Sequence, residues 1–215
     1  GLGDVYKRQV ADSLKREGLY AILATKDGQQ HLNTRVPFGK PLGKVPVEAD
    51  LAKAIESRRI TVSNIFFGST SKEWVFNVTM PLDPELGSAG DALILTQNAS
   101  DLSRLISTEN LPRNWAVAII DGTNRVVVST APDEAAIGKP FVTPAILSEM
   151  QAFSGNFFDG KGNLYAYAQL PGWQWKTVMW GPLAASQAAL VDTWRQMMIG
   201  SLVLVLIAIG GAYLV

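Results

Sequence analysis

The chain has 215 residues, with 19 lysines and arginines balanced by 19 aspartates and glutamates, one histidine and no cysteine. This length allows one domain of ordinary size or two small ones. A net charge of zero excludes a basic footprint for nucleic acid, and the lack of cysteine excludes disulfides and thiolate metal sites.

Residues 1–18 form an N-terminal segment, a remnant of a helix, ahead of the first predicted strand. Within it, residues 1–9 (GLGDVYKRQ) resemble a translated sequencing adapter. They are therefore set aside as non-native sequence and take no part in the fold prediction.

The region after this segment contains an internal repeat. Its first copy is predicted from β-rich runs, glycine turns and helical spacing of apolar residues. The predicted elements are, in order, strands at 20–25 and 29–35, a helix at 49–59, and strands at 64–68, 73–82 and 91–97.

The second copy follows a short linking helix at 100–107. The second strand of each copy ends in a small polar pair, at 33–34 and 129–130, and a Gly-Lys-Pro loop comes after it, at 39–41 and 138–140. The elements of the second copy are strands at 115–120 and 125–130, a helix at 143–153, and strands at 156–160, 163–170 and 174–180. This order predicts an α+β fold of two tandem modules, each with a five-stranded antiparallel sheet and helices.

The C-terminal part of the chain reads as helix. Pro182 opens a segment at 183–196 that we interpret as a stalk helix, with a helix packed on the last sheet as the alternative. Residues 197–215 are 19 consecutive uncharged residues, enough to span a bilayer as a transmembrane helix. The chain is expected to be a fragment, because it begins without methionine and stops within this helix.

A search for catalytic chemistry finds no constellation. His31 has no cysteine partner, Gly68–Ser71 lacks the second glycine of a nucleophile elbow, and no phosphate-binding loop is present. We therefore predict no catalytic residue, metal site or cofactor, and no enzyme activity in this part of the protein. A membrane-anchored hydrolase would need a catalytic cluster that the sequence does not contain.

A ligand pocket is the remaining candidate for chemistry. Alternation along strand 73–82 places Asn77 and Thr79 on one face, where they join Asn33, Arg35 and Ser63 as candidate ligand contacts. Arg35 suits a carboxylate, because its planar fork can bind both oxygens. The alternative is that these residues face solvent on half-exposed strands. The second copy is rich in aromatic residues, and we interpret it as a transmitting module.

These stretches resemble the double Cache sensor, two PAS-like modules in series, of bacterial transmembrane receptors, above all sensor histidine kinases. The resemblance covers about Leu19 to Pro182, with matching stretches at 27–42, 62–68, 115–121, 137–139 and 172–182. It adds Trp74 to the candidate ligand contacts as a loose echo of the amino-acid-binding subclass. That subclass also uses an aspartate that has no match here, so an amino-acid ligand is not supported.

The resemblance implies a membrane-distal module at 19–110, a membrane-proximal module at 111–182, and residues 19–196 outside the inner membrane, in the periplasm. The expected function is sensing of a small molecule by a homodimeric receptor, with transmission through the stalk into the membrane. A histidine kinase is the expected output. The alternatives are a chemoreceptor, a diguanylate cyclase, or an anchored ectodomain that binds a protein.

Overall fold

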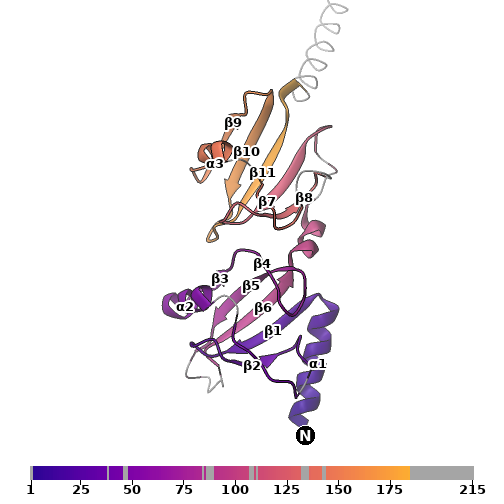
Figure 1. The fold of residues 1–215 in the computed structure, drawn as a ribbon, viewed down its shortest axis with the longest axis vertical. Helices are drawn as coiled ribbons and strands as arrows, with labels where there is room; N and C mark the ends of the chain where they lie inside the picture. The colour runs from indigo at the N-terminus through magenta and orange to yellow at the C-terminus, as the bar shows by residue number, and fades with distance from the viewer. Residues whose placement is uncertain are drawn as a thin grey trace, which may run out of the picture.

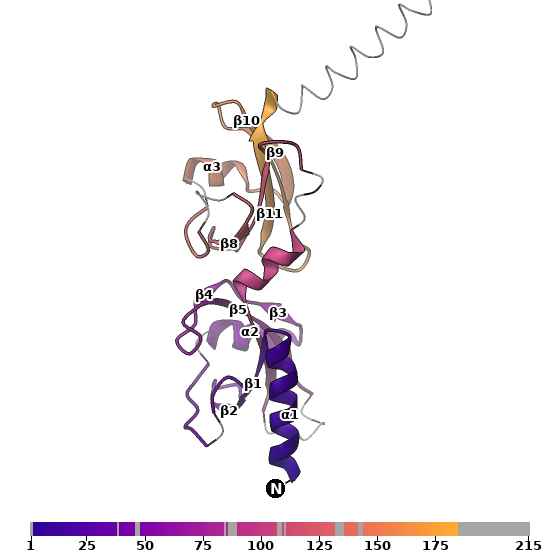
Figure 2. The same ribbon diagram turned by 90° about the vertical axis from the view of Figure 1, so that its right-hand side faces the viewer.

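The structure is a computed structural model that describes residues 2–184, apart from 38, 46–47, 84, 86–89, 107–108, 110, 132–135 and 142–143. Within these residues the chain folds into two modules stacked along the long axis of the molecule, with the short helix η2 between them (Figure 1 and Figure 2). Each module is built on one antiparallel sheet.

The first module comprises α1 (Leu2–Arg16), β1 (Leu19–Ala24), β2 (Gln30–Asn33), α2 (Glu48–Ser57), β3 (Thr61–Val62), β4 (Phe66–Phe67), β5 (Trp74–Pro81) and β6 (Ala92–Asn98). After η2 (Ala99–Leu105), the second module comprises β7 (Ala116–Ile120), β8 (Val126–Ser129), α3 (Pro144–Glu149), β9 (Ser154–Phe158), β10 (Asn163–Gln169) and β11 (Lys176–Pro182).

Corresponding strands take the same places in the two sheets. The first sheet has the order β2-β1-β6-β5-β3, with β4 also paired to β5, and the second has the order β8-β7-β11-β10-β9. All pairs are antiparallel. The predicted α+β class and the internal repeat are therefore confirmed.

One threonine marks equivalent positions in the two modules. The Thr34 hydroxyl accepts the Ala21 N–H at 2.9 Å, and the Thr130 hydroxyl accepts the Val117 N–H at 2.9 Å. In both cases the threonine follows the second strand and ties it to the first, which explains why each second strand ends in a small polar pair.

The two Gly-Lys-Pro loops are not structural equivalents. An isolated bridge pairs Gln29 with Lys44 in the first module, and the corresponding bridge pairs Arg125 with Pro140 in the second. These bridges align Lys44 with Pro140, whereas the shared tripeptide would align Pro41 with it. The repeat is real, but this motif contributed no evidence for it.

Four elements differ from the sequence prediction. The third strand of the first module is broken into β3 and β4, so that sheet has six strands instead of five. Helix α3 stops at Glu149, because the residues from Ser154 pair with β10. The linking helix η2 is a 3-10 helix that starts at Ala99. Helix α1 includes residues 2–9, which the prediction had set aside, and it packs on β1.

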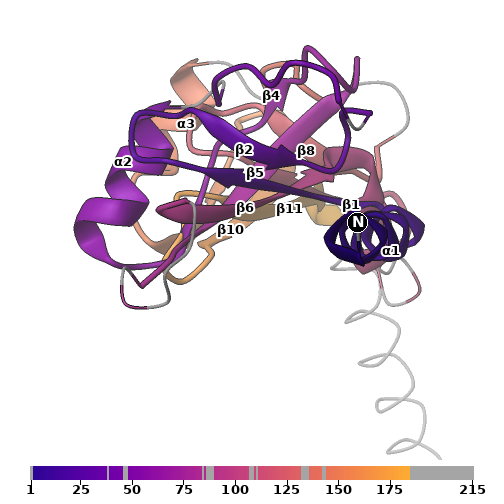
Figure 3. The same cartoon turned by 90° about the horizontal axis from the view of Figure 1, so that it is seen from below.

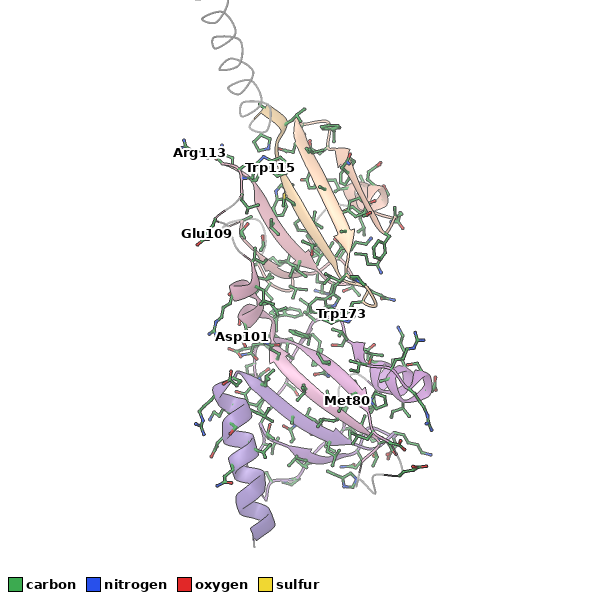
Figure 4. The ribbon with its side chains drawn as sticks, turned by 180° about the vertical axis from the view of Figure 1, so that it is seen from behind. Met80, Asp101, Glu109, Arg113, Trp115 and Trp173 are labelled. Carbon is green, nitrogen blue, oxygen red and sulfur yellow. The ribbon has the colours of Figure 1, made fainter. Side chains whose placement is uncertain are left out.

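Helices cover part of each face of the first sheet. Helix α2 packs over Ala24, Ala92 and Ile94 with its buried Leu51, while α1 lies at the opposite side of the module (Figure 3). Asp101 of η2 lies beside the end of α1, close to Gly18 (Figure 4). Because α2 is short, it covers only one end of its sheet face and leaves the other end to loops.

The predicted membrane helix at 197–215 and the stalk beyond residue 184 lie outside the described residues. Among the helices that the structure does describe, none has the length and apolar character needed to cross a membrane.

Candidate ligand-binding site

The uncovered end of the first sheet forms the floor of a cavity of about 230 Å³. Register places Tyr20, Thr96 and Asn77 side by side on three adjacent strands, on the face that also carries Ile22. Two loops complete the walls, one after β2 and one between β4 and β5. The residues that line the cavity are Tyr20, Ile22, Gln30, Asn33, Arg35, Val36, Pro41, Gly43, Lys44, Phe66, Gly68, Ser69, Thr70, Ser71, Val75, Asn77 and Thr96.

Arg35 is held in place within this cavity. Its guanidinium carbon lies 3.7 Å from the centre of the Tyr20 ring, and its Nη2 donates to the Asn98 Oδ1 at 2.9 Å. The Asn98 amide in turn donates to Glu73 at 2.5 Å. These contacts occupy one face of the guanidinium and one of its N–H groups, so other N–H groups are left for a ligand.

Asn77 presents an unpaired amide to the cavity. The side chain is 3% exposed, and its Oδ1 accepts a hydrogen bond from the Thr96 hydroxyl at 2.8 Å. Its Nδ2 has no partner among the described residues. This amide can therefore donate to a ligand oxygen without giving up an existing hydrogen bond.

A chain of amides shapes the wall opposite Asn77. The Asn33 Nδ2 donates to the Gln30 Oε1 at 2.9 Å, and the Gln30 Nε2 donates to the Lys44 carbonyl at 3.1 Å. The Asn33 Oδ1 accepts the Arg35 N–H at 2.9 Å and so orders the turn that carries Arg35. Asn33 therefore lines the cavity and positions Arg35.

Three of the six predicted contacts thus meet at one cavity, namely Asn33, Arg35 and Asn77. The other three do not line it. Thr79 shares the face of Asn77 but is buried, next to Ile94 in the part of the sheet under α2. Ser63 is 1% exposed and is bonded to the Asn77 backbone through its own N–H and hydroxyl, each at 2.9 Å.

Trp74 lies on the other face of β5, as the alternation predicted, and that face turns toward the second module. Its indole packs against Gly138, and the Arg125 guanidinium carbon lies 5.7 Å from its ring centre. Trp74 is thus part of the junction between the modules. It does not line the cavity, although it was a predicted ligand contact.

Several lining residues were missed by the sequence analysis. Tyr20 lies two residues before Ile22 on β1, and Thr96 pairs with both Tyr20 and Asn77. Strand register therefore places both residues on the cavity face once that face is known. Lys44 and the loop from Gly68 to Ser71 carry no local signal, because they reach the cavity only through the path of two loops.

In the second module, aromatic side chains occupy the equivalent positions on the sheet. The positions of Asn77 and Thr96 are taken by Tyr165 and Trp180, which pair across β10 and β11. Their rings stack with centres 6.4 Å apart, and Trp180 also meets Phe141 at 5.0 Å. Aromatic rings therefore fill the place where the first module has its cavity.

A wider hollow of about 590 Å³ lies against α1, on the other side of segment 33–36. It shares Asn33, Arg35 and Val36 with the cavity and adds the charged residues Asp12, Lys15 and Lys40. Among the described residues, no three histidine or acidic side chains lie close enough together to hold a metal ion.

The break between β3 and β4 connects the cavity to the second module. The Trp175 Nε1 donates to the Ser63 carbonyl at 3.1 Å, and the Ile65 N–H donates to the Asp121 Oδ2 at 3.0 Å. The Gly122 N–H donates to the Asn64 Oδ1 at 2.9 Å. Around these bonds, Phe76 and Trp175 meet edge to face with ring centres 5.1 Å apart. Trp173, on the turn before β11, faces the same junction (Figure 4).

No protein-family model matches the sequence, and neither does any curated protein. Solved structures share its fold. The extracellular domain rpHK1S-Z16, assigned to a histidine kinase, has a TM-score of 0.60 at 12% identity over 86% of this chain and 79% of its own. The ligand-binding domain of Mlp24 with asparagine has a TM-score of 0.56 at 18% identity over 89% and 81%.

The ligand-binding domain of the Pseudomonas aeruginosa amino acid chemoreceptor PctB, in complex with L-Gln, has a TM-score of 0.56 at 12% identity over 85% of this chain and 76% of its own. The chain therefore shares with these domains a fold of two PAS-like modules in tandem. The resemblance to Cache sensors is confirmed at the level of the fold.

Proposed function

We propose that this chain is the ligand-sensing part of a signalling receptor and that the cavity of its first module binds a small molecule. The observation that carries the proposal is the Asn77 amide, whose Nδ2 has no hydrogen-bond partner among the described residues, in the same cavity as Arg35. A volume of about 230 Å³, below the roughly 300 Å³ of the smallest ligand pockets, suits a compact ligand.

The fold neighbours support this function. Mlp24 was solved with asparagine and PctB with L-Gln, each in a domain called ligand-binding. They favour a ligand-sensing role over the alternative, an anchored ectodomain that binds only a protein. The aromatic filling of the second module supports a transmitting role for that module.

The transmission route that we propose runs from Asn77 through Ser63 to the second module. Ser63 holds the Asn77 backbone on one side and accepts the Trp175 indole on the other. A ligand that moves or rigidifies Asn77 therefore acts on the strand break that contacts Trp175 and Asp121. The free energy by which the ligand can shift the equilibrium between two states of this junction equals the difference between its binding free energies for those states.

The remaining parts of the proposal concern the whole receptor. We propose that residues 183–196 form a stalk and residues 197–215 a transmembrane helix, that residues 19–196 lie in the periplasm, and that the receptor is a homodimer. The proposed output domain is a histidine kinase, because the neighbour rpHK1S-Z16 is the extracellular domain of a protein assigned as a histidine kinase. The chemoreceptor neighbour PctB supports a chemoreceptor as the second candidate.

A thermal-shift screen of the purified chain against small carboxylates, amino acids and amines tests the sensing function. A specific ligand at roughly 100 times its Kd adds about 2.7 kcal/mol to the free energy of unfolding. The Arg35→Gln variant should lose this stabilisation, while a variant of the exposed Lys161 should keep it. Absence of any stabilising compound for the folded wild-type chain would contradict the proposal.

A further inference from the structure

The charges around the cavity bear on the chemistry of the ligand. The cavity is lined by two basic residues, Arg35 and Lys44, and by no aspartate or glutamate. Among the described residues, neither basic side chain forms an ion pair. Lys44 only lowers the pKa of Asp27 from a distance, a smaller effect than that of the Thr25 hydrogen bond. The cavity therefore carries an excess of positive charge.

Several polar groups of the cavity can donate hydrogen bonds to a ligand. Arg35 offers guanidinium N–H groups beyond the one bound to Asn98, and Asn77 offers its amide. Ser69, Thr70 and Ser71 line the same space, and a hydroxyl group can donate as well as accept. Donors together with a guanidinium are the groups that bind a carboxylate.

An ammonium group would lack a charged partner here. The acidic residue closest to Arg35 in the hydrogen-bond network is Glu73, which lies outside the lining and already accepts the Asn98 amide at 2.5 Å. An ammonium group brought into the cavity would lose water and meet the field of Arg35 without a carboxylate to offset it. Such unpaired and like-charge contacts are the usual means of rejecting a wrong ligand.

We propose that the site binds a small carboxylate without an ammonium group and discriminates against α-amino acids. This inference rests on the proposed function and specifies the ligand of the same cavity.

Calorimetric titration of the intact chain with matched probe pairs tests the inference. Propionate and alanine differ by one ammonium group, as do succinate and aspartate. We expect the member without the ammonium group to bind about tenfold more tightly or better in at least one pair. Arg35→Gln should weaken that binding by about tenfold or more, and Lys161→Gln, far from the cavity, should leave it unchanged.

A change of one lining residue should reverse the preference. Asn77→Asp keeps the shape of the side chain and its contact with Thr96, but it replaces the free donor with a carboxylate. We expect the variant to bind succinate and propionate more weakly. The ratio of their affinities to those of aspartate and alanine should become smaller or invert. Asn33→Asp, at a half-buried position beside Arg35, serves the same purpose if circular dichroism shows that the first variant does not fold.

The outcomes separate the two proposals. Amino acids that bind as tightly as their matched carboxylates, with a dependence on Arg35, would overturn the ligand class and leave the sensing function intact. The same holds if the thermal-shift screen finds only amines or zwitterions. If no compound of any class binds the folded chain, both proposals fail. A larger carboxylate without an ammonium group, bound through Arg35, would support both.

Discussion

Asp121 offers a direct test of the junction between the two modules. The carboxylate is 3% exposed and accepts four hydrogen bonds. Its Oδ1 accepts three of them from its own turn, from the N–H and hydroxyl of Thr123 and from the Arg125 N–H, at 2.8–2.9 Å. Its Oδ2 accepts only the Ile65 N–H, at 3.0 Å.

Asp121→Asn should remove the contact between modules and keep the turn. The amide oxygen can still accept the three local donors, but the new NH₂ group faces the Ile65 N–H, so two donors meet without an acceptor. Loss of one charge-assisted hydrogen bond at a buried site costs about 1–3 kcal/mol. This cost corresponds to a roughly 5- to 150-fold loss of protection from hydrogen exchange at the Ile65 amide.

Hydrogen exchange resolved at single amides, together with urea unfolding, measures this effect. The matched control is Asp159→Asn, because Asp159 accepts the Lys161 and Asn163 N–H groups in a turn of the second module. The control should leave Ile65 protection unchanged. Equal protection of Ile65 in wild type and Asp121→Asn would refute the assignment of Asp121 as the contact that joins the modules.

Three further predictions concern packing and acid stability. Trp175→Phe should lower the free energy of unfolding by about 2 kcal/mol in urea, because it removes the donor to Ser63 from a site that is 2% exposed; a neutral result would contradict the importance of this bond. Gly138→Ala should cost about 1–3 kcal/mol more than Gly160→Ala, since both have positive φ but only the first would place a Cβ on the Trp74 indole; equal costs would argue against this contact. The Asn163 side-chain hydrogen bond lowers the pKa of Asp159 from 3.8, so its stabilisation is present above that value and is lost as the pH falls through the lower folded pKa. Urea unfolding over this acid range should show a shallower loss of stability for Asp159→Asn, and parallel pH profiles would contradict the prediction.

The sequence was sufficient for features that depend on neighbouring residues. Glycine at position 28, where φ is +82°, predicted the first hairpin turn, and the small polar pairs predicted the ends of the second strands. Alternation along β5 correctly separated Trp74 from Asn77. These features could be predicted because hairpin turns and strand alternation are set within a few residues of the chain.

Prediction failed where the path of a loop or a distant partner decides the outcome. Ser63 carries a hydroxyl suited to a ligand, yet it holds the Asn77 backbone at a strand break. Lys44 reaches the cavity through a long connection without a local signal. The repeated Gly-Lys-Pro pointed to an equivalence that the strand register does not support.

By itself, then, the sequence determined two antiparallel modules in tandem and a set of polar residues on one strand face of the first. Its aromatic second copy already favoured the first module for the pocket, but only the tertiary structure decided which of those residues meet at a cavity. The physical reason is that alternation along a strand fixes which face of the sheet a side chain points to, and it does so equally in both modules. The surroundings of that side chain depend on which loops and side chains cover the sheet. Loops leave space above Asn77, whereas the rings of Tyr165, Trp180 and Phe141 fill the equivalent space in the second module.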